Sequence, residues 1–511
     1  MPLASRVLVA GLISALAGCA GLPAGVDRPS SSAYVDTGGT RIGRALAGAV
    51  AAHPGKTGVV PLLSGRDAFA ARMIIARTAE RSLDVQYYIW HADTTGNLMF
   101  EALWQAAERG VRVRLLLDDQ NTRGLDPTLA ALDAHPNIEV RLFNPFASRA
   151  FRIGDYTHSF ARLNRRMHNK SFTADNQISI VGGRNIGDEY FEAGGSIAFA
   201  DLDTVVEGAV VGDVSAQFDA YWDSESAYPL ASLVPPADAS GAAAVRDAWS
   251  ALSASPEAAA YIDAVQETAL VQQLVVGKLD LEWVSARLVS DDPAKVLHPP
   301  ERREMQMGPR LQAAMGQPTS EMDLVSPYFV PTQEGTNALL AVAARGVKVR
   351  ILTNSLAATD VAPVYAGYVK YREALLRGGV RLFELKPQSD ARPHGKVGAS
   401  SAASLHAKTF AIDRSRIFIG SFNLDPRSAR LNTEVGVVLE SPTLATQLSD
   451  AFDRGIPERA YEVRLTSDRA SVEWIERTAE GEIRHSSTPG ASASRLFFVN
   501  LLRLLPIEWL L

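Results

Sequence analysis

The chain has 511 residues, 47% of them hydrophobic and 21% charged, and its net charge is −6. This length allows two to four domains with a large buried core, and the composition is that of an ordinary globular protein. The acidic balance gives no global attraction for nucleic acid, which counts against a nuclease, although a local basic groove is compatible with it. Cys19 is the only cysteine, so the fold must be stable without an internal disulfide.

The first 18 residues are predicted to be a signal peptide rather than part of the fold. Arg6 precedes an apolar run over residues 7–16, which has the length of a signal-peptide core and is too short to cross a membrane as a helix. The run ends in Leu16-Ala17-Gly18-Cys19, which resembles the lipobox of bacterial lipoproteins. The alternative is an ordinary signal peptide with a chance cysteine.

The lipobox resemblance implies cleavage before Cys19 and lipidation of its sulfur. The protein would then be anchored in the bacterial cell envelope, on the periplasmic side, because several acyl chains hold a protein stably at a membrane. Ala20 follows the cysteine, which by the same resemblance favours the outer membrane over the inner membrane. Residues 19–60 are expected to form a lipidated tether, because residues 21–40 are rich in Gly, Ser and Pro.

An internal duplication organises the rest of the chain. Residues 82–90 are predicted to form a strand, followed by a helix over 96–109 and a strand over 110–117. The same order recurs as a strand over 321–329, a helix over 336–345 and a strand over 346–352. Alternating strands and helices predict an α/β fold with two lobes, residues 61–225 and 318–455, related by a pseudo-twofold axis.

Two segments depart from this repeat. Residues 226–317 are interpreted as an inserted, mainly helical or loop connection that shapes access to the site, or else as a plain solvated linker. Residues 456–511 form a C-terminal extension whose tail is strongly apolar but interrupted by Arg503, Pro506 and Glu508. This tail is expected either to pack against the core or to lie in a membrane interface with Trp509 at headgroup depth.

The most informative motif occurs once in each half. His168-Asn169-Lys170 is followed by Asp175, and His406-Ala407-Lys408 is followed by Asp413, so both copies read H-x-K-x4-D. A histidine and a lysine two residues apart on a strand point to the same face. Two such copies can face each other across one phosphate. The predicted catalytic residues are His168, Lys170, Asp175, His406, Lys408 and Asp413.

This pair suits phosphodiester chemistry without a metal. One neutral imidazole can attack phosphorus and form a phosphohistidine, while the other, protonated, gives a proton to the departing alkoxide. The lysines would neutralise the non-bridging oxygens. Asn185, Ser421 and Asn423, in the turns after each motif, are predicted to donate hydrogen bonds to the phosphate.

Each histidine also needs a partner on its second ring nitrogen. Glu434 is one candidate, at the start of a predicted strand. In the first half the matching residue is predicted to be Asp203, with Asp201 a close second. The alternative role of Asp175 and Asp413 is to support local turns, because each should lie near a strand end.

The paired motifs resemble the phospholipase D superfamily. The flanking sequences are similar to bacterial cardiolipin synthases of the C type, over residues 163–173, 181–187, 290–295 and 420–428. The resemblance implies two αβαβα sandwich lobes that share one active-site cleft, and a phosphatidyl-histidine intermediate with no metal or cofactor. By the same resemblance His168 is the nucleophile and His406 the acid and base, although the two roles could be exchanged.

The resemblance also implies the substrates. A phosphatidyl group from phosphatidylglycerol or phosphatidylethanolamine would pass to the glycerol hydroxyl of another phosphatidylglycerol, giving cardiolipin. The alternatives are a hydrolase that releases phosphatidic acid, a nuclease on the same scaffold and a catalytically silent lipid-binding lipoprotein. No basic and aromatic interleaving supports nucleic acid as a partner, and the sequence names no partner protein.

Overall fold

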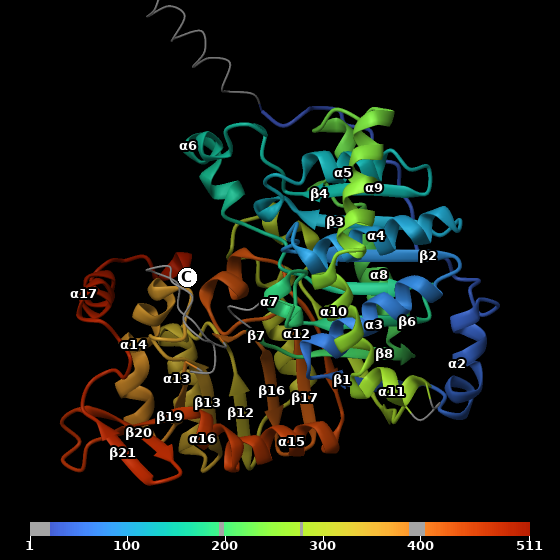
Figure 1. Cartoon of the computed structure of the whole chain (residues 1–511). Coiled ribbons are helices and arrows are strands. Elements are labelled where there is room, and N and C mark those ends of the chain that lie inside the picture. Colours follow the sequence, from blue (N-terminus) through green and yellow to red (C-terminus); the bar gives the residue numbers. More distant parts are fainter. Residues whose placement is uncertain (1–20, 194–198, 276–278, 388–403) are drawn as a thin grey trace, which may run out of the picture.

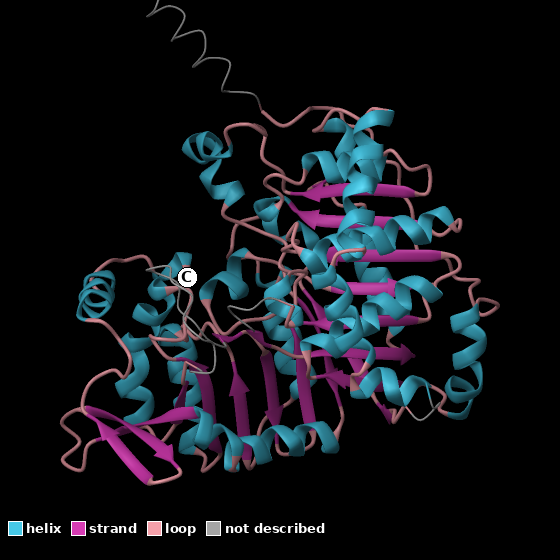
Figure 2. Cartoon of the chain, in the orientation of Figure 1, coloured by secondary structure: helices cyan, strands magenta, loops and turns pink. Residues whose placement is uncertain are grey.

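The chain forms two α/β lobes, each built on one large mixed sheet (Figures 1 and 2). The computed structural model describes residues 21–193, 199–275, 279–387 and 404–511. Cys19 and the predicted signal peptide lie outside the described residues. Strand order is β10-β1-β8-β6-β5-β2-β3-β4-β9 in the first sheet and β11-β18-β17-β16-β12-β13-β14-β19-β20-β21 in the second. The predicted α/β class with two lobes is confirmed.

The first lobe carries a nine-stranded sheet with helices on its faces. Its strands are β1 (Thr57–Leu62), β2 (Ser82–Tyr87), β3 (Arg112–Asp118), β4 (Ile138–Phe143), β5 (Ser171–Ala174), β6 (Ile178–Gly182), β8 (Asp203–Gly208), β9 (Ala227–Pro229) and β10 (Glu282–Val284). Its helices are α2 (Arg41–Ala52), α3 (Gly65–Thr78), α4 (Thr94–Glu108), α5 (Asp126–Asp133), α6 (Arg152–Leu163), α7 (Asp188–Phe191), α8 (Val211–Trp222), α9 (Ala239–Ser253), α10 (Pro256–Gln266) and α11 (Ala269–Val275).

The second lobe repeats this plan around a ten-stranded sheet. Its strands are β11 (Ala286–Ser290), β12 (Glu321–Val325), β13 (Lys348–Asn354), β14 (Arg381–Leu385), β16 (Lys408–Ile412), β17 (Arg416–Gly420), β18 (Val435–Leu439), β19 (Ala460–Leu465), β20 (Val472–Thr478) and β21 (Gly481–His485). Its helices are α12 (Met307–Met315), α13 (Thr332–Ala344), α14 (Ala362–Arg377), α15 (Pro442–Asp453), α16 (Gly455–Arg459) and α17 (Ala493–Leu502).

Strand pairing shows how far the duplication extends. β2, β3 and β4 are parallel neighbours, as are β12, β13 and β14. Antiparallel pairing then continues from β2 through β5, β6 and β8 to β1, and from β12 through β16, β17 and β18 to β11. The repeat unit therefore begins at β1 and at β11, each followed by a helix, α3 or α12. These central strands are buried because helices cover the sheets.

Residues 226–317 are therefore not a separate insertion. β9 and β10 are edge strands of the first sheet, whereas β11 and α12 open the second repeat. Helices α9, α10 and α11 form the added part, and they pack outside α3, α4 and α5. Residues 456–511 are not a plain extension either, because β19, β20 and β21 complete the second sheet.

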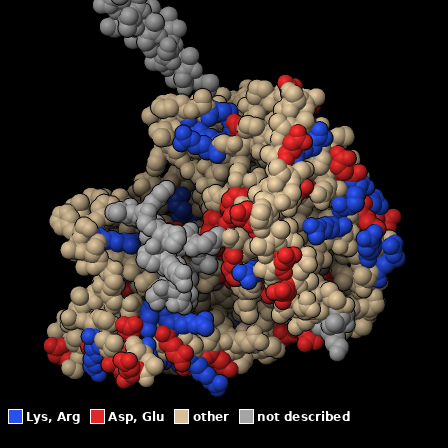
Figure 3. Space-filling model, viewed as in Figure 1, with Lys and Arg blue, Asp and Glu red and all other residues tan. Residues whose placement is uncertain are grey.

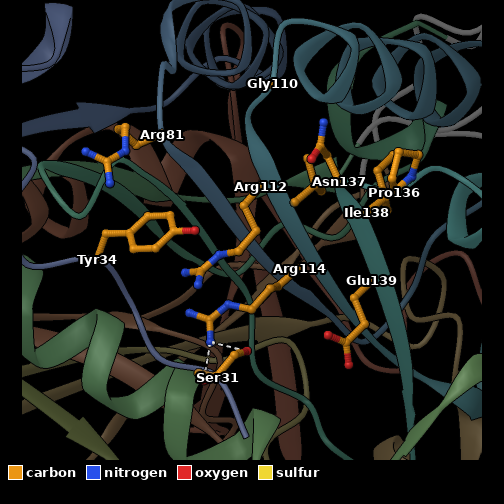
Figure 4. A pocket seen from close by; sticks show the side chains of 11 residues that line it. Ser31, Tyr34, Arg81, Gly110, Arg112, Arg114, Pro136, Asn137, Ile138 and Glu139 are labelled. Atoms are coloured by element: carbon orange, nitrogen blue, oxygen red, sulfur yellow. Dashed lines mark hydrogen bonds between the residues drawn. The ribbon is translucent and has the colours of Figure 1, made fainter. Parts of the chain in front are cut away.

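The segment expected to be a tether also packs on the first lobe. Tyr34 lies under the guanidinium of Arg112 at 3.9 Å, and the Ser31 carbonyl accepts a hydrogen bond of 2.6 Å from Arg114 (Figure 4). Helix α2 and strand β1 follow directly. Of residues 19–60, the part from about Arg28 onward thus belongs to the folded lobe. None of the helices within the described ranges has both the length and the apolar character to cross a bilayer.

An apolar cluster joins the two lobes. It combines buried side chains of β1, β8 and α8 with buried side chains of β16, β17, β18 and α15. Its members include Val59, Val206 and Val211 from the first lobe and Ile417, Ile419 and Leu439 from the second. A further small sheet of two short strands, β7 (Phe199–Ala200) and β15 (Ser404–Leu405), pairs one strand from each half in parallel. The halves are therefore packed into one body around a common interface.

Candidate active site

Each motif histidine is held by the backbone of the opposite lobe. The His168 amide donates to the Thr433 carbonyl at 2.8 Å, and the Thr433 amide donates to the Arg166 carbonyl at 2.9 Å. In the second lobe, the His406 amide donates to the Ala200 carbonyl at 2.8 Å. The chain thus forms two short cross-lobe pairings, and each brings a histidine beside a carboxylate of the other half.

The carboxylates bind the histidines crosswise. Nδ1 of His168 lies 2.8 Å from Oε2 of Glu434, and Nδ1 of His406 lies 2.6 Å from Oδ2 of Asp201. Both histidines and both carboxylates are buried. With Nδ1 occupied by a carboxylate, the Nε2 atom of each ring is left for chemistry.

Asp203, predicted as the partner of a histidine, has a different role. Its carboxylate binds Arg72 at 2.8 Å and accepts the Arg184 amide at 3.0 Å. The sheet register explains the error, because Asp203 pairs with Gly182 just as Gly436 pairs with Gly420. The residue equivalent to Glu434 is two positions earlier, which is Asp201.

Glu434 sits in a dense hydrogen-bond network. The hydroxyls of Ser421 and Ser428 donate to its two oxygens, at 2.5 and 2.7 Å. The Ser421 hydroxyl, predicted to bind phosphate, is therefore engaged with a carboxylate. The Glu434 amide donates to Asp291 at 2.8 Å, and Asp291 also binds Lys295 at 2.9 Å. Residues 291–295, placed by the sequence in a connecting segment, thus position the partner of His168.

The two asparagines of the turns differ from each other. Asn185 accepts the Ile89 amide at 3.2 Å and donates to the Tyr190 hydroxyl at 3.0 Å, so most of its amide is used within the protein. The Oδ1 atom of Asn423 is buried and has no hydrogen-bond partner among the described residues. Because Oδ1 can only accept, a hydrogen bond from Asn423 to a phosphate oxygen would have to come from its side-chain NH2 group.

Asp175 and Asp413 lie away from the histidines. Asp175 accepts the amides of Arg81 and Ser82, at 2.7 and 2.9 Å, and Asp413 accepts those of Ser320 and Glu321, at 2.7 and 3.0 Å. Both aspartates adopt left-handed backbone conformations, with φ of 53° and 50°, in the tight turns after β5 and β16. The structure therefore gives both aspartates a structural role. Each holds the backbone amides at the start of β2 or β12 and does not reach a phosphate bound at the histidines.

Two buried lysines give the site its positive charge. Lys170 Nζ donates to the His168 carbonyl at 2.5 Å, and Lys408 Nζ lies 3.0 Å from Nδ1 of His406. Burial lowers the pKa of Lys170 to about 7 and that of Lys408 to about 8. An anion bound between these ammonium groups would restore their ordinary basicity.

Burial and the nearby lysines also act against a positive charge on both imidazoles. They lower the pKa of His168 well below its ordinary value, and they lower the pKa of His406 as well, although Asp201 opposes the second shift. Burial raises the pKa of Glu434 to about 7. Burial acts in the same direction on Asp201, but the charges of His406 and Lys408 overcome it and hold its pKa below the ordinary range. His406 therefore lies beside the more firmly ionised carboxylate.

Aromatic rings line the histidines, a feature that the motifs did not indicate. The Tyr88 ring meets His168 edge-on at 5.0 Å between centroids, and Tyr190 meets His406 in the same way at 5.3 Å. Phe199 lies 5.2 Å from His406. The duplication offered no signal for these side chains, since Tyr88 lies in a loop, Tyr190 in the short helix α7 and Phe199 in the two-residue strand β7. Within the described part of the chain, no cluster of three metal-ligating side chains occurs.

Fold and site together define an enzyme of the phospholipase D class, with two H-x-K copies in one composite site. The family model "Cardiolipin synthase, PLD-like domain" matches residues 74–222 and 311–456, which are most of both lobes. The chain therefore belongs to this family, and it is an enzyme of the H-x-K phosphatidyltransferase type.

Relatives of known sequence agree with this assignment. The chain is 48% identical to cardiolipin synthase C of Escherichia coli (strain K12), over 90% of its own length and 97% of that protein. It is 24% identical to the major cardiolipin synthase of Bacillus subtilis (strain 168), over 76% and 67% of the two chains. Among solved structures, phosphatidylserine synthase of Haemophilus influenzae Rd KW20 matches with a TM-score of 0.51 and 14% identity, covering 79% of this chain and 87% of that one. This last likeness concerns the fold alone.

Proposed function

We propose that the protein synthesises cardiolipin by moving a phosphatidyl group between phospholipids. The acceptor is the glycerol hydroxyl of phosphatidylglycerol, and the donor is phosphatidylglycerol or phosphatidylethanolamine. The crosswise pairing of His168 with Glu434 and of His406 with Asp201 carries this proposal. It fixes two imidazoles at one junction with a free Nε2 on each, which is what two successive displacements at one phosphorus need.

In the first step, Nε2 of His168 attacks the donor phosphorus, and the bond from phosphorus to the headgroup oxygen breaks. His406 gives its proton to that oxygen, so the headgroup alcohol leaves neutral. In the second step, His406 takes the proton from the glycerol hydroxyl of phosphatidylglycerol. The resulting alkoxide attacks phosphorus, and the bond from phosphorus to His168 breaks.

The two carboxylates favour this division of roles. An ionised Asp201 stabilises the imidazolium form of His406, which the acid role requires. Glu434, whose pKa burial raises to about 7, gives His168 less support for a positive charge, so His168 stays neutral and nucleophilic. Lys170 and Lys408 would neutralise the non-bridging oxygens, and the side-chain NH2 group of Asn423 would donate a hydrogen bond to one of them.

Lipid analysis of the purified protein tests this function. Incubation with phosphatidylglycerol should give cardiolipin and glycerol, and both His168→Ala and His406→Ala should abolish the product. Thin-layer chromatography separates cardiolipin from phosphatidic acid. Phosphatidic acid without cardiolipin would show that water is the acceptor and would replace the synthase by the hydrolase.

The place of action is a second part of the proposal. Leu16-Ala17-Gly18-Cys19 supports lipidation of Cys19 and anchoring on the periplasmic side, with the outer membrane favoured. Metabolic labelling with a fatty-acid analogue should mark the wild type and not the Cys19→Ser variant. Density separation of the two membranes then locates the labelled protein, and an unlabelled wild type would contradict the anchor.

A further inference from the structure

Two elements of the protein expose large apolar side chains to solvent. On α6 and its start, Phe151 is 67% and Ile153 70% exposed. On α17 and the residues after it, Phe497 is 72% and Leu504 80% exposed, and Trp509 is 57% exposed. Phe160, Phe498, Leu501 and Leu505 add to the same two groups. Clusters of this kind are uncommon on a surface that faces only water.

α17 cannot be explained as a simple core helix. Val499 and Leu502 face the second lobe and are buried, yet Phe497, Phe498 and Leu501 on the same helix face outward. A surface helix that packs on one side normally carries polar residues on the other. Here the outer side is apolar as well, which indicates a second apolar environment.

The two exposed groups lie on the same side of the molecule. α6 projects from the first lobe and α17 from the second, both on the left in Figure 1, and the outline of the molecule is notched between them in Figure 3. The surface over α17 in that view is mostly uncharged. We name these two groups, residues 151–160 and 497–509, the apolar rim.

Arg427 joins both parts of the rim to the active site. Its guanidinium binds the Leu510 carbonyl at 2.7 Å, beyond α17, and the Asn164 side chain at 2.8 Å, directly after α6. Its amide donates to the Leu511 carbonyl at 2.7 Å. Ser428, the next residue, holds Glu434, and Asn164 leads along the chain to His168. The rim therefore borders the elements that carry the chemistry.

Charge around the rim complements an anionic surface. Residues 486–509 contain Arg495, Arg503 and a single acidic residue, Glu508, which is paired with Lys370 at 3.6 Å. At α6, Arg149 and Arg152 are neutralised by Asp119 and Asp126, but Arg162 and Arg165 bond only amide or carbonyl oxygens and keep their net charge, and Asp155 is buried. Arginines beside exposed aromatic and aliphatic side chains are typical of segments that lie in the interface of an anionic bilayer. Tryptophan is enriched at the same depth.

We propose that the apolar rim inserts into the interface of an anionic phospholipid bilayer and places the active site against the lipid headgroups. This contact is separate from the predicted lipid on Cys19, which would only keep the protein near a membrane. The proposal deepens the proposed function, because it rests on a substrate that resides in a bilayer. Its occupant is a lipid surface, not a partner protein.

Site-specific fluorescence tests the insertion. Because Cys19 is the only cysteine, a full-length chain with Cys19→Ser accepts one new cysteine for an environment-sensitive label. Leu504→Cys and Ile153→Cys report on the rim, and Val275→Cys, which is 75% exposed on α11, is the matched control. All three carry His168→Ala so that no turnover alters the vesicles.

With vesicles of phosphatidylglycerol and phosphatidylethanolamine, the labels at positions 504 and 153 should shift to the blue, and the label at 275 should not. The shift should be much smaller with phosphatidylcholine alone. Unchanged spectra at 504 and 153 would overturn the proposal, even if residues 1–18 carry the protein to the vesicles. Since the labelled chains are inactive, the result does not depend on whether the enzyme is a synthase or a hydrolase.

A rate measurement adds an independent check. The double variant Phe497→Ser, Leu504→Ser should lose at least about ten-fold of the rate on lipid in vesicles, because less apolar area reaches the interface. Its rate on a short-chain phosphatidylglycerol dissolved as monomers should equal that of the wild type, and Val275→Ser should match the wild type on both. Equal losses on both substrates would show a structural defect and contradict the proposal.

Discussion

At the scale of single residues, the two histidines have unlike surroundings in a nearly symmetric frame. His168 is paired with a glutamate that two serine hydroxyls also bind, whereas His406 is paired with an aspartate and lies within 3.0 Å of a lysine. Within the described residues, Asp201 accepts one further hydrogen bond, from the Leu202 amide at 2.8 Å. These unlike partners give the two rings different proton affinities, as an acid and a nucleophile require.

The buried lysines predict an unusual pH dependence. For the free enzyme, kcat/KM should rise as pH falls toward the lowered pKa of His406, because the acid role needs its imidazolium, while His168, whose pKa is lowered further, stays neutral. The value should fall as pH rises through about 7, where Lys170 loses its proton. Lys170→Arg stays charged, so the additional loss of kcat/KM near pH 7 should be absent, and the next loss should come at about pH 8, where Lys408 titrates. An alkaline limb at the same pH in both enzymes would contradict this assignment.

The neighbouring carboxylates Asp201 and Asp203 should give opposite phenotypes. Asp201→Asn should lower kcat by about 10²- to 10⁴-fold with little change in thermal stability, because an amide cannot stabilise the His406 imidazolium. Asp203→Asn should cost about 3–5 kcal/mol of stability, because it leaves the buried Arg72 charge unpaired. Its folded fraction should retain the wild-type kcat. Rate assays and melting curves on both variants check this, and a kcat loss confined to Asp203→Asn would restore the sequence-based choice.

The sequence could identify the histidines, the lysines and Glu434, because each lies in a motif or at its predicted strand. The sequence could not show which of Asp201 and Asp203 is the partner of a histidine. Two residues apart on an extended segment, they point to the same face, so strand periodicity does not distinguish them. The distinction comes from pairing with Gly182 and from the other lobe, both of which are non-local. The Ser421 hydroxyl was misassigned for a similar reason, since either a phosphate or a carboxylate could accept its proton.

At the scale of elements, the aspartates that complete the two motifs hold neighbouring strands together and take no part in catalysis. Each follows β5 or β16, the strand that comes after the motif histidine, enters a left-handed turn and accepts amides at the start of the neighbouring β2 or β12. The constant number of residues between histidine and aspartate is therefore set by the short strand, β5 or β16, that lies between them. A motif can thus recur through architecture as well as through catalysis.

Asp175→Ala should accordingly affect stability and not turnover. Loss of its charged hydrogen bonds and strain of alanine at positive φ should remove about 2–4 kcal/mol of stability. Asp175→Asn, which tolerates this backbone and keeps one acceptor, should lose less. At a temperature where both variants stay folded, cardiolipin formation should proceed at the wild-type kcat. A reduced kcat with an unchanged melting temperature would return Asp175 to the catalytic set.

The duplicated strands were predictable because they are long, apolar and repeated. The short strands were not: β9 and β10 have three residues each, too few to show a period. As a result, residues 226–317 resembled an insertion although they complete one sheet and begin the other. The tether predicted over residues 19–60 rested on the Gly, Ser and Pro content of residues 21–40, which does not reveal that Tyr34 and Ser31 pack on arginines of the first sheet.

At the scale of the whole molecule, the apolar cluster between the lobes fixes how each histidine lies relative to the carboxylate of the other lobe. Ile419→Ala in this cluster should cost about 2–5 kcal/mol and also lower kcat, because the cross-lobe pairings depend on the fit of the two sheets. Ile351→Ala is the control, equally buried but in the core of the second lobe alone. It should cost similar stability without a change in kcat. Melting curves and rate assays below the transition distinguish the two, and equal kcat values would show that the interface does not control the geometry.

The crosswise pairing also constrains how the two halves can change in evolution. A duplicated unit normally leaves one copy free to diverge, but here the acid group in each copy serves the histidine of the other. A substitution at position 201 acts on position 406, more than two hundred residues away, and leaves His168 with its own partner. Among descendants of this chain, variation should therefore be correlated between 201 and 406, and between 434 and 168, rather than within each half. Each half therefore depends on the carboxylate of the other half, and neither copy can be lost or exchanged alone.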